Sequence, residues 1–157
     1  MVMAGVLMAA CNNEEQNGQM SEADKLIENT QKTKNYPELL KVVDSLETTG
    51  SITPTKAYYW RGYACDKMKR QRLAEFYWKA SLDAAENATS SDEMAYYAKS
   101  ASRLANMLSV RGDYEEGLNA AVPAANKLEE LHCDSTSDYL NILIYRLLSG
   151  GLRHSQW

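Results

Sequence analysis

The sequence predicts an all-helical protein built from antiparallel helix pairs, and two observations support this. Residues that favour helices, such as Ala, Leu, Glu, Lys and Met, are plentiful, whereas the alternating Val, Ile and Thr runs of strands are missing. Small side chains also recur at helical spacing on one face of the segment from Arg111 to Leu128. Such a face lets a second helix approach closely.

Most of the expected helices begin at a residue that can cap a helix N-terminus. Thr53 is followed by Pro54, which suits a first turn, and Ser90 with Glu93 has the spacing of a capping box. The segment from Lys69 to Arg72 is a polar link. The expected helices cover about 21–33, 35–46, 53–68, 73–86, 90–110, 113–131 and 139–148, with Asp113 capping the sixth.

One spacing recurs three times along these helices. A small or apolar residue is followed by others after twelve, then four, then three residues. This recurrence predicts a helical repeat of about three pairs plus one terminal helix. The three sets are Ile27, Leu39, Val43 and Leu46; Gly62, Ala74, Trp78 and Ser81; and Ala105, Gly117, Ala121 and Ala124.

The residues from Gly112 to Leu118, with Leu104 and Ala105 before them, resemble a tetratricopeptide (TPR) turn, and Tyr58, Gly62 and Ala74 match in the middle unit. The resemblance covers residues 21–149 and implies a short right-handed solenoid whose first helices line a concave, partner-binding surface. Two departures occur. The spacing from Ala74 to Gly117 exceeds the usual TPR period, which predicts an insertion in the loop at 87–92 and in the first turns of the next helix. Pro123 lies within a helix and predicts a bend.

The N-terminus carries an uncharged apolar run, Met1 to Ala10, followed by Cys11 and a polar tether at 12–20. The residues from Leu7 to Cys11 resemble a bacterial lipobox. That resemblance implies that residues 1–11 contain a signal-peptide remnant, that Cys11 carries a lipid, and that the protein is anchored to a membrane outside the cytoplasm. The alternative is a frayed apolar N-terminus with a buried Cys11.

The chain has few candidates for catalytic, metal-binding or disulfide-forming residues. The only histidines, His132 and His154, have no paired nucleophile, so the sequence predicts no enzyme and no cofactor. The run from His132 to Asp134 lacks a second ligand pair, which argues against a metal site. Cys65 and Cys133 either form a disulfide or, more simply, Cys65 is a core residue. The sequence from Asn87 to Thr89 matches a glycosylation acceptor but is interpreted as a polar loop.

A net charge of −4, spread along the chain without a basic block, argues against nucleic acid as a partner. The TPR resemblance instead implies a protein or peptide partner in the groove of the first helices. Lys99 and Arg103 match half of a carboxylate clamp, but the other half is absent, because the matching places carry Asp24 and Glu28 in one unit and aromatics in the next. The predicted groove residues are Lys56, Tyr59, Tyr63, Lys99, Arg103 and Asn106.

Tyr59 and Tyr63 also fit two other interpretations. They either pack between helices or stack on a sugar ring. The apolar last helix and the irregular residues 150–157 suggest that the chain continues past Trp157, that a partner covers this face, or that two copies associate through it.

Lipobox, tether and loosely spaced repeats together resemble the N-terminal extracytoplasmic part of certain bacterial sensor histidine kinases. The expected function is therefore signal reception by a lipid-anchored TPR domain. The alternatives are a stand-alone scaffold lipoprotein of the envelope and a glycan-capturing lipoprotein with TPR-like helices.

Overall fold

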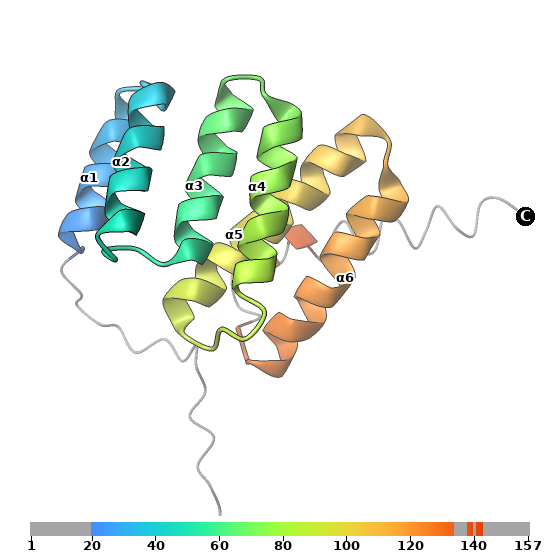
Figure 1. Ribbon diagram of the computed structural model, residues 1–157. Coiled ribbons are helices and arrows are strands. Elements are labelled where there is room, and N and C mark those ends of the chain that lie inside the picture. Colours follow the sequence, from blue (N-terminus) through green and yellow to red (C-terminus); the bar gives the residue numbers. More distant parts are fainter. Residues whose placement is uncertain (1–19, 134–137, 140, 143–157) are drawn as a thin grey trace, which may run out of the picture.

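A computed structural model describes residues 20–133, 138–139 and 141–142 of the chain, and the described part is all-helical, as the sequence predicts (Figure 1). The expected boundaries of the first six helices agree with the structure to within two residues. The helices that begin and end within residues 20–133 are α1 (Glu22–Lys32), α2 (Tyr36–Thr48), α3 (Pro54–Lys67), α4 (Gln71–Ala84), α5 (Ser91–Arg111) and α6 (Tyr114–Glu130).

Four of these helices begin with a side-chain cap at the residue that the sequence indicates. In each case the side-chain oxygen accepts a hydrogen bond from the backbone N–H three residues later, which satisfies one of the free donors at a helix start. The capping residues are Ser21, Asn35, Thr53 and Ser90.

The prediction that Asp113 caps the sixth helix is only partly correct. This residue holds the N-cap position of α6, but its side chain accepts no capping hydrogen bond. Its carboxylate is instead ion-paired with Arg111, at the end of the preceding helix. Gly112 between them has φ +93°, a left-handed conformation that glycine adopts without steric cost. The turn is therefore made by glycine and closed by a charge pair.

Helices adjacent in the chain pack against one another, and α3 also packs against α5. The turns after α1 and α3 lie at one end of the row of helices, at the top of Figure 1, and the links after α2 and α4 lie at the opposite end. The chain thus runs up and down in antiparallel pairs, with contact between the first helices of the second and third pairs.

The repeated spacing marks the packing surface between the helices. Every member of the three sets is buried except Leu46, which is half-buried. Trp78 is the largest fully buried side chain, and its four-residue offset from Ala74 places both on the same face of α4. The alanines of the third set, Ala105, Ala121 and Ala124, lie in a core of α5 and α6 that also includes Ile142.

Pro123 lies inside α6, and the helix continues through it as one element from Tyr114 to Glu130. The ring removes one backbone donor from the helix. Pro123 itself is exposed, whereas its neighbours Ala124 and Ala125 are buried. The helix therefore turns its proline to solvent and keeps its small residues in the core.

Several predicted features lie outside the described residues. These are the apolar run and lipobox with Cys11, the tether up to residue 19, and most of the last helix with the tail at 150–157. Of the last helix, Tyr139 and Ile142 are described, and both are buried against α5 and α6. None of the helices in the described part has the length and hydropathy that crossing a membrane requires.

Candidate functional site

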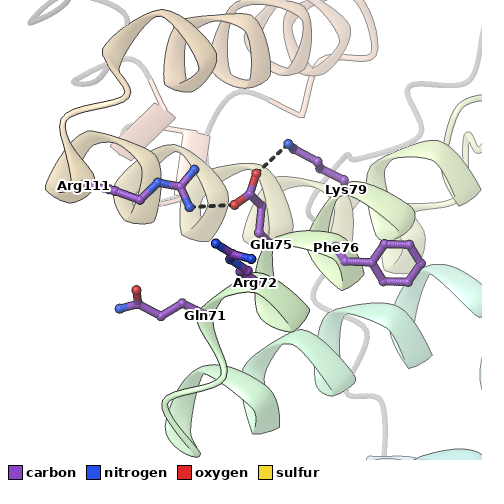
Figure 2. A pocket seen from close by; sticks show the side chains of 6 residues that line it. All are labelled: Gln71, Arg72, Glu75, Phe76, Lys79 and Arg111. Carbon is purple, nitrogen blue, oxygen red and sulfur yellow. Dashed lines mark hydrogen bonds and ion pairs between the residues drawn. The ribbon is translucent and has the colours of Figure 1, made fainter.

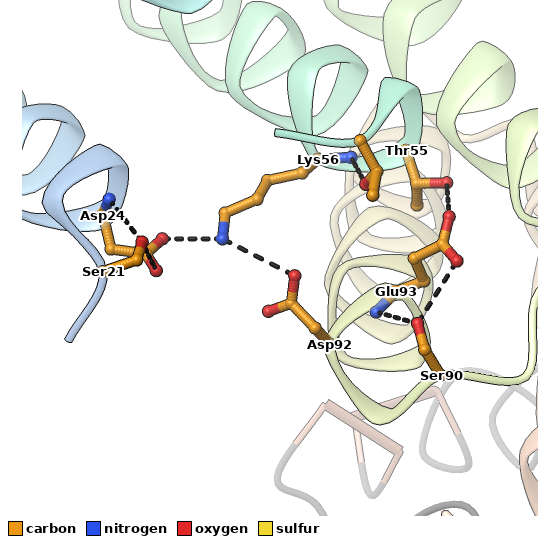
Figure 3. A network of polar contacts seen from close by, with 8 residues as sticks. Ser21, Asp24, Thr55, Lys56, Ser90, Asp92 and Glu93 are labelled. Carbon is orange, nitrogen blue, oxygen red and sulfur yellow. Dashed lines mark hydrogen bonds and ion pairs between the residues drawn. The ribbon is translucent and has the colours of Figure 1, made fainter. Parts of the chain in front are cut away.

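The first helices of the pairs meet at their N-terminal turns around one lysine. The ammonium group of Lys56, in the first turn of α3, lies 2.6 Å from Asp24 Oδ1 in α1 and 3.6 Å from Asp92 Oδ2 in α5 (Figure 3). Its side chain is only 6% exposed. Each carboxylate lies in the first turn of a helix, where the helix dipole also favours negative charge.

In this cluster the ion pairs and hydrogen bonds together affect the pKa values of Lys56 and Asp24 more strongly than burial does. Burial would lower the pKa of Lys56, but the hydrogen bond to Asp24 raises the pKa above its ordinary value. Burial would raise the pKa of Asp24, but hydrogen bonds from Lys56 and Ser21 lower the pKa below its ordinary value. Both groups are therefore charged at neutral pH, and the ammonium group of Lys56 is bound by carboxylates of the domain itself.

A second polar connection joins α3 and α5 through α4. Ser100 on α5 donates to Ser81 on α4 over 2.8 Å, and Ser81 donates to the carbonyl of Thr55 on α3 over 2.8 Å. The Thr55 hydroxyl donates to Glu93 over 3.2 Å, and Glu93 also accepts from the Ser90 hydroxyl (Figure 3). The carboxylate of the predicted capping box thus holds α5 against α3.

Next to this cluster, aromatic rings of α3 and α5 pack together. The ring of Tyr59 lies 5.3 Å from that of Tyr96 and 5.1 Å from that of Trp60, and Trp60 lies 5.4 Å from Tyr63. Tyr59, Tyr63 and Tyr96 are 6%, 9% and 8% exposed. The structure therefore places Tyr59 and Tyr63 between helices, in agreement with the packing interpretation. Little ring surface is left for a sugar to stack on.

Cations cover these rings. Lys99 Nζ lies 4.7 Å from the ring centre of Tyr96, and both Arg103 and Lys67 lie over Tyr63, at 5.8 Å and 5.4 Å. Burial raises the pKa of Tyr59, and the nearby Arg103 guanidinium partly offsets that effect. We call this surface the aromatic–basic strip; it consists of Tyr59, Trp60, Tyr63, Lys67, Tyr96, Lys99 and Arg103.

The strip brings together most of the residues that the sequence predicts for a groove. Lys56 also lies over Tyr96, at 4.9 Å from the ring centre, and Asn106 is exposed on α5 one turn beyond Arg103. Lys67 and Arg103 are exposed and Lys99 is half-buried. None of these three cations forms an ion pair with any residue that the structure describes.

Sequence reasoning missed Tyr96, which joins the two helices, and Trp60. Trp60 precedes Arg61, which turns toward α2 and pairs with Asp44 and Glu47. The aromatic run from Tyr58 to Trp60 was the available signal for a ring cluster. Tyr96 had a weaker signal, because it lies in the part of α5 that extends beyond the repeat.

Most of the other residues that the sequence singles out are described by the structure. Cys65 is a free, buried thiol, so it is not bonded to Cys133, and burial raises its pKa. Across the described ranges, no three His, Cys, Asp or Glu side chains gather in a way that would hold a metal ion. Asn87 and Thr89 are exposed in the link between α4 and α5, and Asp134 lies outside the description.

No family model, curated protein or solved structure matches this chain. The geometry of the helix pairs and of the strip therefore carries the functional argument.

Proposed function

We propose that this chain is a TPR-like binding domain that holds an acidic segment of a protein partner on the aromatic–basic strip. The observation that carries the proposal is the convergence of Lys67 from α3 and Arg103 from α5 on the ring of Tyr63. Both cations are exposed and form no ion pair with a described residue. An anionic group bound beside this ring is therefore attracted to both of them.

The strip is also preorganised for binding. Its rings are fixed between helices, so the cations stacked on them are restrained before a partner arrives, which reduces the entropy lost on binding. A protein segment fits better than a sugar, because the buried tyrosine faces offer little stacking surface. The half clamp expected from Lys99 and Arg103 is consistent with a carboxylate ligand.

The arrangement of the helices supports the solenoid part of the proposal. Sequential antiparallel pairs with a recurring buried register, and the packing of α3 against α5, the first helices of the second and third pairs, agree with a TPR-type solenoid. In that arrangement, the first helices form the binding face.

The cellular setting is proposed from the N-terminal sequence. Cys11 after an apolar run supports a lipid anchor, and hence a domain that receives a signal outside the cytoplasm for a membrane signalling protein. Changing Cys11→Ser in the full chain should move the protein from the membrane fraction to the soluble fraction and remove a lipid mass. An unchanged distribution would refute the anchor.

Binding is tested with peptides of known charge. Random twelve-residue peptides are selected by display on the immobilised domain, and the selected sequences are compared with the starting pool. We expect enrichment of Asp and Glu, and about tenfold weaker binding by fluorescence anisotropy for Arg103→Gln. The matched control is Lys41→Gln, an exposed lysine already paired with Glu38. Selected peptides without acidic enrichment, or equal binding by both variants, would contradict the proposal.

A further inference from the structure

A second group of cations lies at the turn between α3 and α4. Lys69, Arg70 and Arg72 fall within four residues, and all three are exposed. None of them forms an ion pair with a residue in the described part of the chain, whereas surface lysines such as Lys32 and Lys41 are paired with a neighbouring glutamate. This turn therefore presents uncompensated positive charge on a chain whose net charge is −4.

These cations occupy unfavourable positions for folding. Arg70 is the N-cap residue of α4 and makes no side-chain capping hydrogen bond, and Arg72 lies in the first turn. A helix N-terminus carries positive partial charge, so cations there are destabilising, and an Arg cannot accept a bond from the free N–H groups. Four other helices of this chain start with a capping oxygen. Helix stability alone does not account for the arginines.

A surface hollow of about 660 Å³ opens beside this turn. Its floor is the Glu75 carboxylate, which is held by Arg111 at 2.8 Å and Lys79 at 2.7 Å. Figure 2 shows Gln71 and Arg72 on one side of Glu75 and the ring of Phe76 on the other. Phe76 is 62% exposed, and Leu73 on the same helix is 44% exposed.

The side chains around the hollow favour an acidic protein segment over a nucleic acid. Lys79 and Arg111 are compensated by Glu75 and lie within 4.0 Å of Glu116, so the hollow has no continuous cationic track for a phosphate backbone. The free charge of Arg72 lies at the rim, and the exposed ring of Phe76 lies on the other side of Glu75. Arginine and exposed aromatic side chains on one surface are typical of a protein–protein contact site.

We propose that this hollow and the basic turn at Lys69 to Arg72 form a second docking surface, for a protein segment that carries carboxylates next to aromatic or aliphatic side chains. Arg72 binds the carboxylate, and Phe76 packs against the apolar side chain. The surface is distinct from the aromatic–basic strip and does not depend on it.

The test uses three fluorescein-labelled peptides and the full chain at physiological salt. One peptide alternates glutamate with phenylalanine, one alternates glutamine with phenylalanine, and one alternates glutamate with serine. We expect the first to bind, and both others to bind at least tenfold more weakly, because each lacks one of the two required contacts. The measurements are made on the Arg103→Gln variant, in which the strip is weakened, and in that variant Arg72→Gln and Phe76→Ser should each weaken binding of the first peptide by about a further tenfold.

Each remaining outcome overturns the inference. Equal binding of the glutamine peptide removes the role of charge, and unchanged binding by Arg72→Gln or Phe76→Ser removes this surface. Absence of any binding of the first peptide to the Arg103→Gln variant assigns the peptide to the strip instead. Stronger binding of phosphatidylglycerol vesicles or of a single-stranded oligonucleotide than of the acidic peptide assigns the turn to another class of partner. Both exposed substitutions are checked for an unchanged melting temperature.

Discussion

A Cβ atom built on Gly62 of α3 would lie 2.4 Å from Nε1 of Trp78 on α4. The indole is 2% exposed, and its N–H has no hydrogen-bond partner among the described residues. The two helices therefore approach so closely at this point that only glycine fits against the ring. The contact lies at the centre of the middle helix pair.

We expect Gly62→Ala to destabilise the protein by about 1–3 kcal/mol, because the added methyl group forces the indole or the helix axis to shift. Gly117→Ala is the matched control. Its Cβ would be 3.4 Å from Ser109 Oγ, an ordinary contact, and alanine favours a helix, so it should stabilise by about 0.5–1 kcal/mol. Urea unfolding measures both. Equal effects of the two substitutions would show that the Trp78 contact does not restrict residue 62.

The buried chain from Ser100 through Ser81 to the Thr55 carbonyl should behave as one unit. Ser81 and Ser100 are fully buried. Ser81→Ala should cost about 1–3 kcal/mol, because it leaves both the carbonyl and the Ser100 hydroxyl without their partner. Adding Ser100→Ala removes that orphaned hydroxyl. The double variant should therefore be more stable than the sum of the single losses predicts, by about 0.5 kcal/mol or more. Strict additivity in denaturant unfolding would argue against the chain.

The Asp24–Lys56 pair predicts that α1 detaches in acid. Because the pKa of Asp24 is lowered in the folded state, its contribution to stability is present above the unfolded value of about 3.9 and is lost as the pH falls through the lower folded value. Hydrogen exchange of the α1 amides, corrected for intrinsic rates, should speed up below about pH 4. Asp24→Asn should show the fast exchange at pH 7 already. Unchanged α1 protection in that variant would contradict the role of the pair.

Lys56 predicts a loss of stability at alkaline pH. Because its folded pKa is raised, its contribution is complete below the unfolded value of about 10.4 and is lost as the pH rises through the higher folded value. Lys56→Met should remove this alkaline transition of α1 while leaving exchange in α6 unaltered. An alkaline transition that persists in Lys56→Met must come from another group.

Cys65 should be unreactive in the native state. It is 2% exposed and burial raises its pKa, so the thiolate is both scarce and inaccessible at neutral pH. Peptide mapping after brief iodoacetamide treatment should find Cys65 unmodified in buffer and fully modified in urea. Rapid native labelling would show that the core around α3 opens more readily than its packing indicates.

Helix starts and packing register were predictable from sequence because both depend on local chemistry. Ser21, Asn35, Thr53 and Ser90 cap by reaching three residues along the chain, and the small residues repeat at spacings that a helix imposes. Asp113 failed as a side-chain cap because Arg111, two residues away, competes for its carboxylate. That competition depends on the geometry of the turn at Gly112.

The contact of Tyr96 with Tyr59 was not predictable from the repeat, although the longer spacing predicts extra residues in the first turns of this helix. Helix α5 begins 14 residues before Ala105, whereas α3 begins 8 residues before the equivalent Gly62. The insertion therefore lengthens α5 at its start, and Tyr96 lies on this added part, against α3. The ion pairs of Lys56 were equally unpredictable, since its partners Asp24 and Asp92 lie 32 residues before it and 36 residues after it. No local pattern tells whether a lysine on a predicted groove faces solvent or an acid of another pair.

The tie at Lys56 has a mechanical consequence. A row of helices held only by contacts between neighbours peels from its free end, one pair after another, when it is pulled from that end. Here the start of α1 is fastened to the start of α5 through a single ammonium group, which bypasses α2 and α4. A force applied at Met20 is therefore shared with the third pair from the outset. Under such a force, α1 is expected to unfold together with the helices that Lys56 connects, rather than separately before them.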